Sequence, residues 1–301
     1  MTDLSIIIVN WNTRELLRAC LASVNQHTTG LEHEVIVVDN HSADGSPAMV
    51  RAEFPEVRLI ENPQNLGFAA GNNQGIRLAR GRAVLLLNSD TELVENSAKT
   101  LFDFLFSKET IGAAGGLLIY PGGGAQWSYG YEPSLGRMLW ITLSGLLRIP
   151  WGRKPVAIVP GTDAGPRPVE YIVGADLMIK KNVLDRVGLL DESFFAYFEE
   201  TDLCARIRQA GFEVRYTPAT RILHRIGSSF SADATAKLRI YYTSLFRYLQ
   251  KHRGGYHLVK VYLLAKFGVH ALWSRGHEDA RNRFRAIWMS GLEYPRRGDD
   301  R

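Results

Sequence analysis

The sequence has little of the features that would define several other classes of protein. It contains two cysteines in 301 residues, too few for a disulfide framework or a cysteine-based zinc site. No run approaches the roughly 18 uncharged apolar residues of a spanning helix. The first residues include an acid at position 3 and a strand-sized apolar run, which is not the pattern of a signal peptide. We therefore expect a protein of the reducing cytosol.

Several familiar motifs are also missing. The first apolar segment is not followed by GxGxxG or by a glycine-rich loop ending in Lys-Ser/Thr, and the chain has no GxSxG or HExxH sequence. A nucleotidyltransferase would be expected to have a Gly/Arg/Lys-rich phosphate loop after the first strand, and the segment 10–12, Asn-Trp-Asn, does not supply one. A nucleotide, if bound, must be held by side chains at strand ends together with a metal ion.

The charge is divided unevenly along the chain. Hydrophobic residues make up 46% and charged residues 22%, which is ordinary globular composition. Residues 1–220 have 20 Lys and Arg against 25 Asp and Glu, whereas residues 221–301 have 16 against 6. A basic tail on an acidic body predicts an anionic partner, either a membrane surface or a nucleic acid. We expect no nucleic acid, because no recognised binding motif accompanies the charge.

Short apolar runs alternate with amphipathic helical patterns through the first hundred residues. The sequence predicts strands at 4–9, 35–38, 57–60 and 83–87, and helices at 14–24, 47–54 and 68–79. This alternation predicts an α/β fold with a mostly parallel central sheet flanked by helices. Residues 121–168 are rich in glycine and proline and are expected to form a long, loop-rich connection. We predict one domain over 1–230 and a basic helical extension over 231–301.

Three clusters are candidates for chemistry. The segment 88–92, Asn-Ser-Asp-Thr-Glu, follows a buried strand, where the ligand crevice of such a sheet lies. The segment 198–202, Phe-Glu-Glu-Thr-Asp, places three acids at a helix start, and these acids could equally serve only the helix dipole. His224 ends a strand-like segment, and a lone histidine is more often structural than a ligand.

Eight motifs in this order resemble the family 2 glycosyltransferases, in particular the rhamnosyltransferase-like members that build bacterial cell-surface polysaccharide. The matching segments cover about residues 4–230. They are Leu4–Asn12, Val37–Ser46, Asn65–Asn73, Leu86–Asp90, Gly174–Met178, Leu190–Phe195, Phe198–Leu203 and His224.

The resemblance implies a GT-A fold and an inverting transfer of a sugar from a nucleotide-diphosphate donor to a hydroxyl. It implies Mg²⁺ or Mn²⁺ bound by Asp90 and His224, although Asn88 replaces the first acid of the usual metal motif. It implies Glu200 as the general base, with Glu199 as the fallback and Asp202 beside them. The residues implied to bind the donor are Val9, Asn10, Trp11, Asp39, Asn65, Gly67, Asn73 and Asp90.

Two function classes stay open at this point. One is an active, metal-dependent glycosyltransferase; the other is a catalytically silent sugar-nucleotide-binding or scaffold subunit, since fold does not fix function. Retention of Asp90 and Glu200 favours the enzyme. The resemblance favours dTDP-rhamnose as donor, with a UDP-hexose second, and a glycan or lipid-linked acceptor. A homo-oligomer stays open.

The basic tail adds an expectation about location. Residues 256–273 are apolar but interrupted by Lys260 and Lys266. Such a segment suits a helix lying on anionic lipid at the inner face of the cell membrane, and it suits equally a packed helical subdomain with a basic surface. In the membrane interpretation, the apolar side chains expected to enter lipid are Leu263, Leu264, Phe267 and Trp273.

Overall fold

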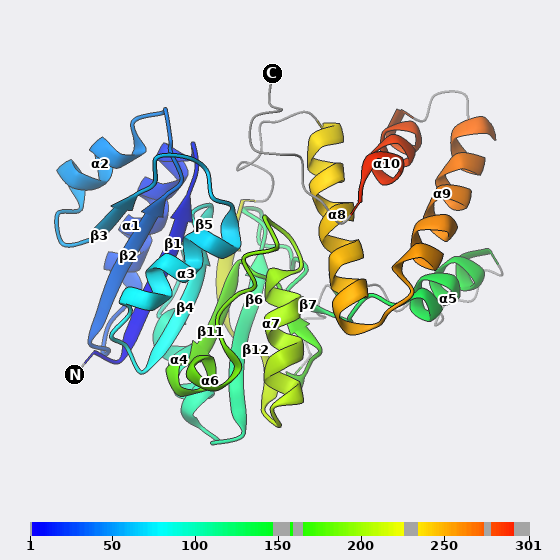
Figure 1. Cartoon of the computed structure of the whole chain (residues 1–301). Helices are drawn as coiled ribbons and strands as arrows, with labels where there is room; N and C mark the ends of the chain where they lie inside the picture. Colours follow the sequence, from blue (N-terminus) through cyan, green and yellow to red (C-terminus); the bar gives the residue numbers. More distant parts are fainter. Residues whose placement is uncertain (1, 147–156, 159–164, 226–233, 274–277, 292–301) are drawn as a thin grey trace. The chain divides into compact units, whose positions relative to one another are not determined.

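The computed structural model describes residues 2–146, 157–158, 165–225, 234–273 and 278–291 (Figure 1). The chain divides into two compact units. The first comprises residues 1–132, 155–193 and 199–229, and the second comprises residues 133–154, 194–198 and 230–301. Compared with the ranges expected from the sequence, the second unit also takes in residues 133–154 and 194–198.

A mixed, mostly parallel sheet forms the centre of the first unit. Its strand order is β3-β2-β1-β4-β11-β6-β12-β5, with β9 paired to β12. The strands β1 to β4 run parallel, and β11 is antiparallel to both of its neighbours. The strands are β1 (Leu4–Asn10), β2 (His33–Asp39), β3 (Arg58–Glu61), β4 (Ala83–Asn88), β5 (Thr91–Leu93), β6 (Ile111–Ile119), β9 (Arg167–Pro168), β11 (Asp176–Lys180) and β12 (Glu213–His224).

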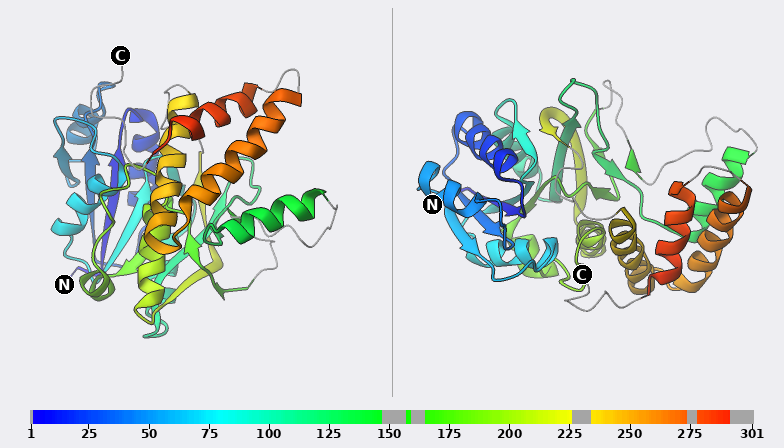
Figure 2. Two further views of the ribbon diagram at one scale, coloured as in Figure 1. Left: turned by 45° about the vertical axis from the view of Figure 1, so that its right-hand side comes forward. Right: turned by 90° about the horizontal axis from the view of Figure 1, so that it is seen from above.

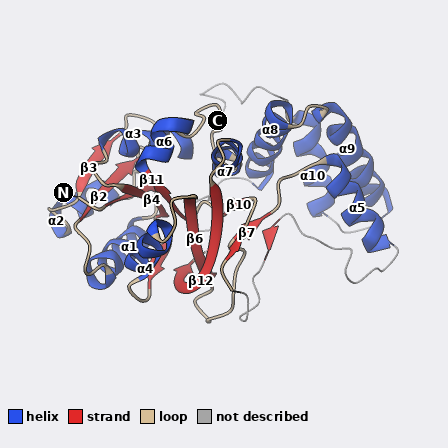
Figure 3. Cartoon of the chain, turned by 90° about the horizontal axis from the view of Figure 1, so that it is seen from below, coloured by secondary structure: helices blue, strands red, loops and turns tan. Residues whose placement is uncertain are grey.

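Helices cover both faces of this sheet, which confirms the predicted α/β class (Figure 3). Ile6 and Ile8 of β1 pack toward one layer, and Ile7 packs toward the other, so the strand is apolar throughout. The first layer contains α1 (Arg14–His27), α2 (Ser46–Glu53) and α4 (Ser97–Phe106). The second contains α3 (Phe68–Leu78), α6 (Lys181–Val187) and α7 (Glu199–Gln209).

The glycine-rich connection holds more regular structure than the sequence indicated. The apolar segment after residue 134 forms α5 (Leu135–Leu146), and short strands lie on either side of it. β7 (Tyr129–Gly130) pairs with β8 (Ala157–Ile158) and β10 (Tyr171–Ile172) in a small antiparallel sheet. In its described parts, the predicted loop-rich connection over 121–168 therefore contains one helix and two-residue strands joined by turns and loops.

The second unit is helical and has its own aromatic core. It contains α5, α8 (Ala234–His252), α9 (Tyr256–Trp273) and α10 (Glu278–Met289). Phe246 and Tyr248 of α8 are fully buried among side chains from α9, α10 and the segment 194–198. Among the described helices, none combines the length and the apolar composition needed to cross a membrane.

One carboxyl group is buried within the central sheet. Asp176, at the start of β11, has no exposed surface, and its Oδ2 accepts a hydrogen bond from Gly116 N at 2.6 Å. Its Oδ1 has no hydrogen-bond partner among the described residues. Burial raises the pKa of Asp176 well above its usual value, so the folded protein favours the protonated acid.

This burial predicts a pH-dependent effect of Asp176→Asn on the free energy of unfolding. An unfolded aspartic acid ionises near pH 3.9, so the cost of keeping Asp176 protonated grows as pH rises from about 4 toward its raised folded-state pKa. Urea unfolding should show similar stability for both proteins at pH 4 and greater stability of the variant at pH 8. The exposed Asp185, paired with Lys181, supplies the control Asp185→Asn. A constant difference across this pH range would contradict the assignment.

Candidate active site

Polar side chains at the carboxyl ends of β1 and β2 hold one another in place. The parallel register pairs Asn10 with Asp39. Asn10 Nδ2 donates to Asp39 Oδ2 at 2.8 Å and to Ser42 Oγ at 3.0 Å, while Ser42 N donates to Asp39 Oδ1 at 2.8 Å. Asp39 is buried, whereas Val9 and Trp11 on either side of Asn10 are half-buried. The structure thus brings four of the predicted donor-binding residues to one edge of the sheet.

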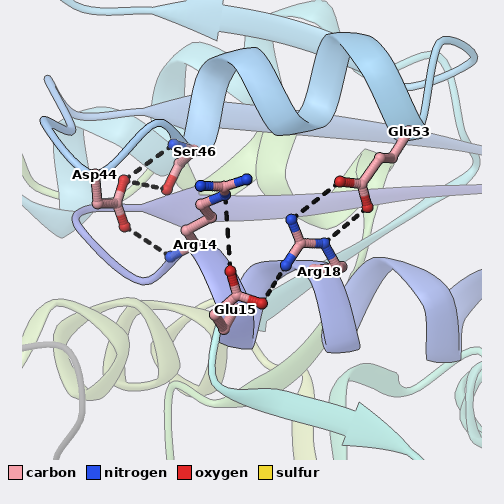
Figure 4. A network of polar contacts seen from close by, with 6 residues as sticks. All are labelled: Arg14, Glu15, Arg18, Asp44, Ser46 and Glu53. Atoms are coloured by element: carbon pink, nitrogen blue, oxygen red, sulfur yellow. Dashed lines mark hydrogen bonds and ion pairs between the residues drawn. The ribbon is translucent and has the colours of Figure 1, made fainter.

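The loops after β1 and β2 are tied together by a polar network (Figure 4). Arg14 N donates to Asp44 Oδ2 at 2.7 Å, and Asp44 Oδ1 accepts from Ser46 Oγ at 2.6 Å. The Arg18 guanidinium donates twice to Glu53, at 2.7 and 3.0 Å, which joins α1 to α2. These contacts fix the two loops that border the end of the sheet.

Two residues of these same loops have an unusual backbone conformation. Asn12 and His41 have φ of 53° and 67°, in the left-handed region that residues other than glycine seldom adopt. Asn12 N donates to Ser42 Oγ at 2.9 Å, and Asn12 Oδ1 accepts from Ala43 N at 2.8 Å. Hydrogen bonds between the loops therefore support a conformation that is costly by itself.

Asn65 and Gly67 shape the start of α3. Asn65 Oδ1 accepts from Gly67 N at 2.9 Å, and Gly67 O accepts from Asn40 Nδ2 at 3.0 Å. Gly67 has φ of 86°, which favours glycine at this position. Asn40 lies directly after β2, so these bonds connect the entry of α3 to the same sheet edge.

Asn73 has a different environment from the one predicted. Its Nδ2 donates to Leu190 O at 2.8 Å and to Glu192 Oε1 at 3.0 Å, and its Oδ1 accepts from Leu190 N at 3.1 Å. Both amide hydrogens are therefore occupied by the segment 190–192. We assign Asn73 to holding this segment against α3, in place of donor binding.

Asp90 and His224 meet at the carboxyl end of β4. The pairing of β5 with β12 places His224 opposite Thr91. Both side chains are largely buried, and Asp90 Oδ1 lies 3.4 Å from His224 Nε2. The turn that carries Asp90 is fixed by Thr91 Oγ1, which donates to Asn88 O at 2.7 Å, and by Arg225 N, which donates to Asp90 O at 2.9 Å.

A buried glutamine orients the His224 ring. Gln126 Nε2 donates to the main-chain oxygens of His224 and Ile119 at 2.6 and 3.1 Å, which leaves its Oε1 facing His224 Nδ1 at 3.1 Å. A carbonyl oxygen only accepts, so Nδ1 carries the proton and donates it to Gln126. In the neutral imidazole, Nε2 is then an acceptor. Nε2 and Asp90 Oδ1 are two acceptors facing each other, an arrangement that calls for a proton or a cation between them.

Asp90 and His224 fit two neighbouring ligands of one divalent cation. Metal–oxygen and metal–nitrogen distances of roughly 2.0–2.2 Å agree with donor atoms 3.4 Å apart. Asn88 Oδ1, in the same turn, is buried and has no hydrogen-bond partner among the described residues. Within the described residues, no cluster of three or more His, Cys, Asp or Glu could hold a metal. Phosphate oxygens and water would complete the coordination, as is usual for Mg²⁺.

The first acids of α7 differ in their surroundings. Glu199 is 4% exposed, and burial followed by the negative charge of Glu200 raises its pKa well above the usual value. Glu200 is half-buried, and its Cγ lies 3.5 Å from the position of a Cβ added to Gly174. Ala175, which follows Gly174 in the chain, accepts a hydrogen bond from Asn88 N at its main-chain oxygen, at 3.1 Å. Glu200 therefore adjoins the segment that borders the turn of Asp90.

Asp202 holds α7 in place. It is fully buried and forms an ion pair of 2.9 Å with Arg206, one helical turn away. Arg206 also donates to the main-chain oxygens of Val187 and Leu189 at 2.8 and 2.7 Å. With its carboxylate committed to this cluster, Asp202 is assigned a structural role, in place of the predicted catalytic one.

Gln126 is not among the site residues predicted from the sequence. A single glutamine in a glycine-rich segment has no motif, and its role depends on main-chain oxygens 7 and 98 residues away in the chain. Only its complete burial distinguishes it, and burial is a property of the fold.

Comparison with known proteins identifies the family. The model for glycosyl transferase family 2 matches residues 5–167. The chain belongs to this family. It is 28% identical over 271 residues to the N-acetylglucosaminyl-diphospho-decaprenol L-rhamnosyltransferase of Mycobacterium tuberculosis, covering 85% of this chain and 87% of the relative. The resemblance seen in the motifs is confirmed, and the chain is a glycosyltransferase.

Two solved structures show the same GT-A fold. GalNAc-T7, solved with UDP, GalNAc and Mn²⁺, has a TM-score of 0.62 at 15% identity; the alignment covers 95% of this chain and 54% of that one. The mannosyltransferase PcManGT from Pyrobaculum calidifontis, in complex with GDP-Man and Mn²⁺, has a TM-score of 0.58 at 16% identity, covering 96% of this chain and 86% of that one. At these identities the likeness establishes the fold alone.

The role of Gln126 predicts a change in metal affinity. Gln126→Met keeps the length of the side chain but removes the acceptor of His224 Nδ1, so Mn²⁺ should bind roughly 10- to 100-fold more weakly in the presence of a nucleoside diphosphate. Electron paramagnetic resonance of free Mn²⁺ measures this affinity directly. Gln74→Met is the matched control, because Gln74 exchanges two amide hydrogen bonds of 2.9 Å with Asn62 and contacts neither Asp90 nor His224. Equal Mn²⁺ affinity in both variants would refute the orienting role.

Proposed function

We propose that this enzyme transfers a sugar, with rhamnose favoured, from a nucleotide-diphosphate donor to a hydroxyl of a glycan or lipid-linked acceptor, with inversion and with a divalent metal ion. The observation that carries the proposal is the facing pair of acceptors, Asp90 Oδ1 and His224 Nε2, at the carboxyl end of β4. The rhamnosyl relative, named for a diphospho-decaprenol acceptor, supports the choice of sugar and of acceptor. The presence of Mn²⁺ in both related structures supports the metal.

The strand-end loops would hold the donor. Asp39 and Asn10 lie at the base of these loops, with Val9 and Trp11 beside them and the α3 entry at Asn65 and Gly67 bordering the same edge. The nucleoside would lie against these residues, which places the diphosphate toward Asp90 at the end of the adjacent strand β4. This order follows the strand order β2-β1-β4 across the sheet.

The metal site would act on the leaving group. A divalent cation held by Asp90 and His224 would supply Lewis-acid stabilisation of the negative charge that develops on the departing nucleoside diphosphate. The protein's own part is to keep both ligands fixed: β5 and β12 set their separation, and Gln126 sets the tautomer of His224.

Glu200 is proposed as the general base. A single in-line displacement inverts the anomeric carbon and needs one carboxylate to accept the proton of the attacking hydroxyl. Burial raises the pKa of Glu199, which favours its protonated form and disfavours it as the acceptor of this proton. Glu200 is partly accessible, and its negative charge contributes to the raised pKa of Glu199. The two adjacent acids therefore have unequal roles.

The unequal roles predict opposite results for two isosteric substitutions. Glu200→Gln removes the base and should lower kcat by about 10²-fold or more, with nucleotide affinity unchanged. Glu199→Gln replaces a protonated acid by an amide of the same shape and should retain most of the activity. Release of nucleoside diphosphate from the donor measures both. An inactive Glu199→Gln beside a nearly normal Glu200→Gln would move the base by one residue.

Donor choice and metal dependence can be tested together. Hydrolysis and transfer are measured over a panel of sugar nucleotides, with dTDP-L-rhamnose expected to react fastest and UDP-hexoses second. Excess EDTA should abolish turnover, and added Mn²⁺ or Mg²⁺ should restore it. Asp90→Ala should be inactive with an unchanged circular dichroism spectrum, whereas the exposed-acid control Asp103→Ala should be active. Full activity in EDTA would rule out the metal site.

A further inference from the structure

Large apolar side chains are exposed mainly on the second unit. Among the described residues, the exposed ones in the first unit are Val94, Tyr120 and Trp127. Those in the second unit are Leu139, Trp140, Leu143, Leu258, Val261, Val269, Trp288 and Met289. A gathering of this kind on three helices of one small unit indicates an interaction surface, because single exposed apolar residues are normally scattered.

The outer side of α9 is apolar along its length. Its exposed residues Leu258, Val261, Ala265 and Val269 recur every three or four positions, which places them in one stripe. The stripe contains no charged residue. This differs from the expectation that the basic residues of 256–273 would face outward beside the apolar ones.

The two lysines that interrupt the apolar sequence of α9 turn toward the helical bundle. Lys260 Nζ donates to Ser290 O and lies 5.8 Å from the centre of the Phe246 ring. Lys266 Nζ donates to Thr142 Oγ1 at 3.2 Å and lies 6.0 Å from the centre of the Tyr262 ring. Both lysine side chains are therefore bound within the unit, and neither interrupts the exposed apolar stripe of Leu258, Val261, Ala265 and Val269.

The side chains expected to enter lipid are largely in the core. Leu263 is 8% exposed, and Leu264 and Phe267 pack against the same buried cluster. The side chain of Trp273 lies outside the described part of the chain. The expectation that Leu263 would enter lipid was therefore wrong. The apolar side chains of α9 that are available for such a contact are those of the exposed stripe.

Helices α5 and α10 both adjoin α9 (Figure 2). On one side Tyr262 Oη donates to Met138 O of α5 at 3.1 Å, and α5 exposes Leu139, Trp140 and Leu143. On the other side a Cβ added to Gly268 would lie 3.3 Å from the Phe284 ring of α10. Tyr262 and Gly268 lie on opposite sides of the stripe at 100° per residue. Helices α5 and α10 therefore both adjoin α9, and all three helices expose apolar side chains.

Helix α10 adds aromatic and basic groups to this surface. Trp288 is 68% exposed, and Arg281 and Arg285 are exposed on the same side of the helix. An open hollow of about 460 Å³ is lined by Phe284, Arg285, Trp288 and Met289. Tryptophan, arginine and aliphatic side chains together are the composition of a surface that contacts lipid head groups and the upper part of the acyl chains.

The charge of the second unit indicates which partner would bind this surface, a second copy of the chain or an anionic membrane. Its residue ranges contain 18 Lys and Arg against 6 Asp and Glu, a net charge of +12. A second copy of the same surface would be repelled by this charge, whereas an anionic membrane would be attracted. We propose that the outer surface of α5, α9 and α10 docks on an anionic lipid bilayer, with the apolar stripe of α9 lying in the interface. We call it the docking surface below.

The test compares matched pairs of substitutions. Val261→Glu with Trp288→Glu places two charges on the docking surface, and Val94→Glu with Trp127→Glu places the same two changes on the first unit. Each full-length protein is sedimented with vesicles of phosphatidylcholine alone and of phosphatidylcholine with about 30% phosphatidylglycerol. The parent and the Val94/Trp127 variant should bind the anionic vesicles equally. The Val261/Trp288 variant should bind at least about tenfold more weakly, with an unchanged circular dichroism spectrum.

Three results would overturn the proposal. These are failure of the parent to bind anionic vesicles, equal loss of binding in both double variants, and equal binding to both kinds of vesicle. Light scattering measures the oligomeric state of the same proteins. If the parent is a dimer and only the Val261/Trp288 variant is a monomer, the docking surface is instead a contact between two copies of the chain. None of these measurements uses donor or acceptor, so their outcome is independent of the proposed transfer reaction.

Discussion

The candidate site depends on two acceptor atoms held 3.4 Å apart, Asp90 Oδ1 and His224 Nε2. With Nδ1 of His224 donating to Gln126, the Nε2 of a neutral imidazole and Asp90 Oδ1 are both acceptors, and a proton or a cation between them would satisfy both. The surrounding structure holds the two atoms in these positions. The pairing of β5 with β12 fixes the main chain near both residues. The amide hydrogens of Gln126 are donated to main-chain oxygens, which leaves only its carbonyl oxygen for the His224 ring. This arrangement supports the proposal that Asp90 and His224 bind a divalent cation.

The adjacent acids at the start of α7 show how burial divides roles between identical side chains. Glu199 and Glu200 have the same chemistry and lie one residue apart. Because helix geometry turns successive residues by 100°, one side chain is directed into the protein and the other is left partly accessible. Burial and the neighbouring charge raise the pKa of the first, and the second is the side chain that we propose as the base. The sequence could place both acids at a helix start, but only packing distinguishes them.

The parts of the fold that the sequence predicted best are those with one repeated local signal. The strands β1, β2 and β4 are continuous apolar runs ended by Asn10, Asp39 and Asn88, and their parallel pairing follows from the intervening helices. The strand β6 was missed, since its Ile-Gly-Ala-Ala-Gly-Gly start lacks the bulky residues typical of strands. Its glycines are explained by close neighbours: a Cβ on Gly115 would lie 2.3 Å from Ile172 Cγ2. Such contacts join distant segments and leave no local pattern.

The same limit applies to Asn73, Asp202 and the lysines of α9. A motif or a charge run identifies a residue's chemistry but not the direction of its side chain. Asn73 and Asp202 occur in matching motifs yet are occupied by main-chain and arginine partners, and Lys260 and Lys266 point into the bundle. On α9, the inward direction of the two lysines leaves an apolar outer face where a basic one was expected. The long-range attraction of the second unit to anions then comes from its total charge, while close contact falls to apolar groups. If the docking surface binds lipid as proposed, its binding depends both on lipid charge and on individual side chains.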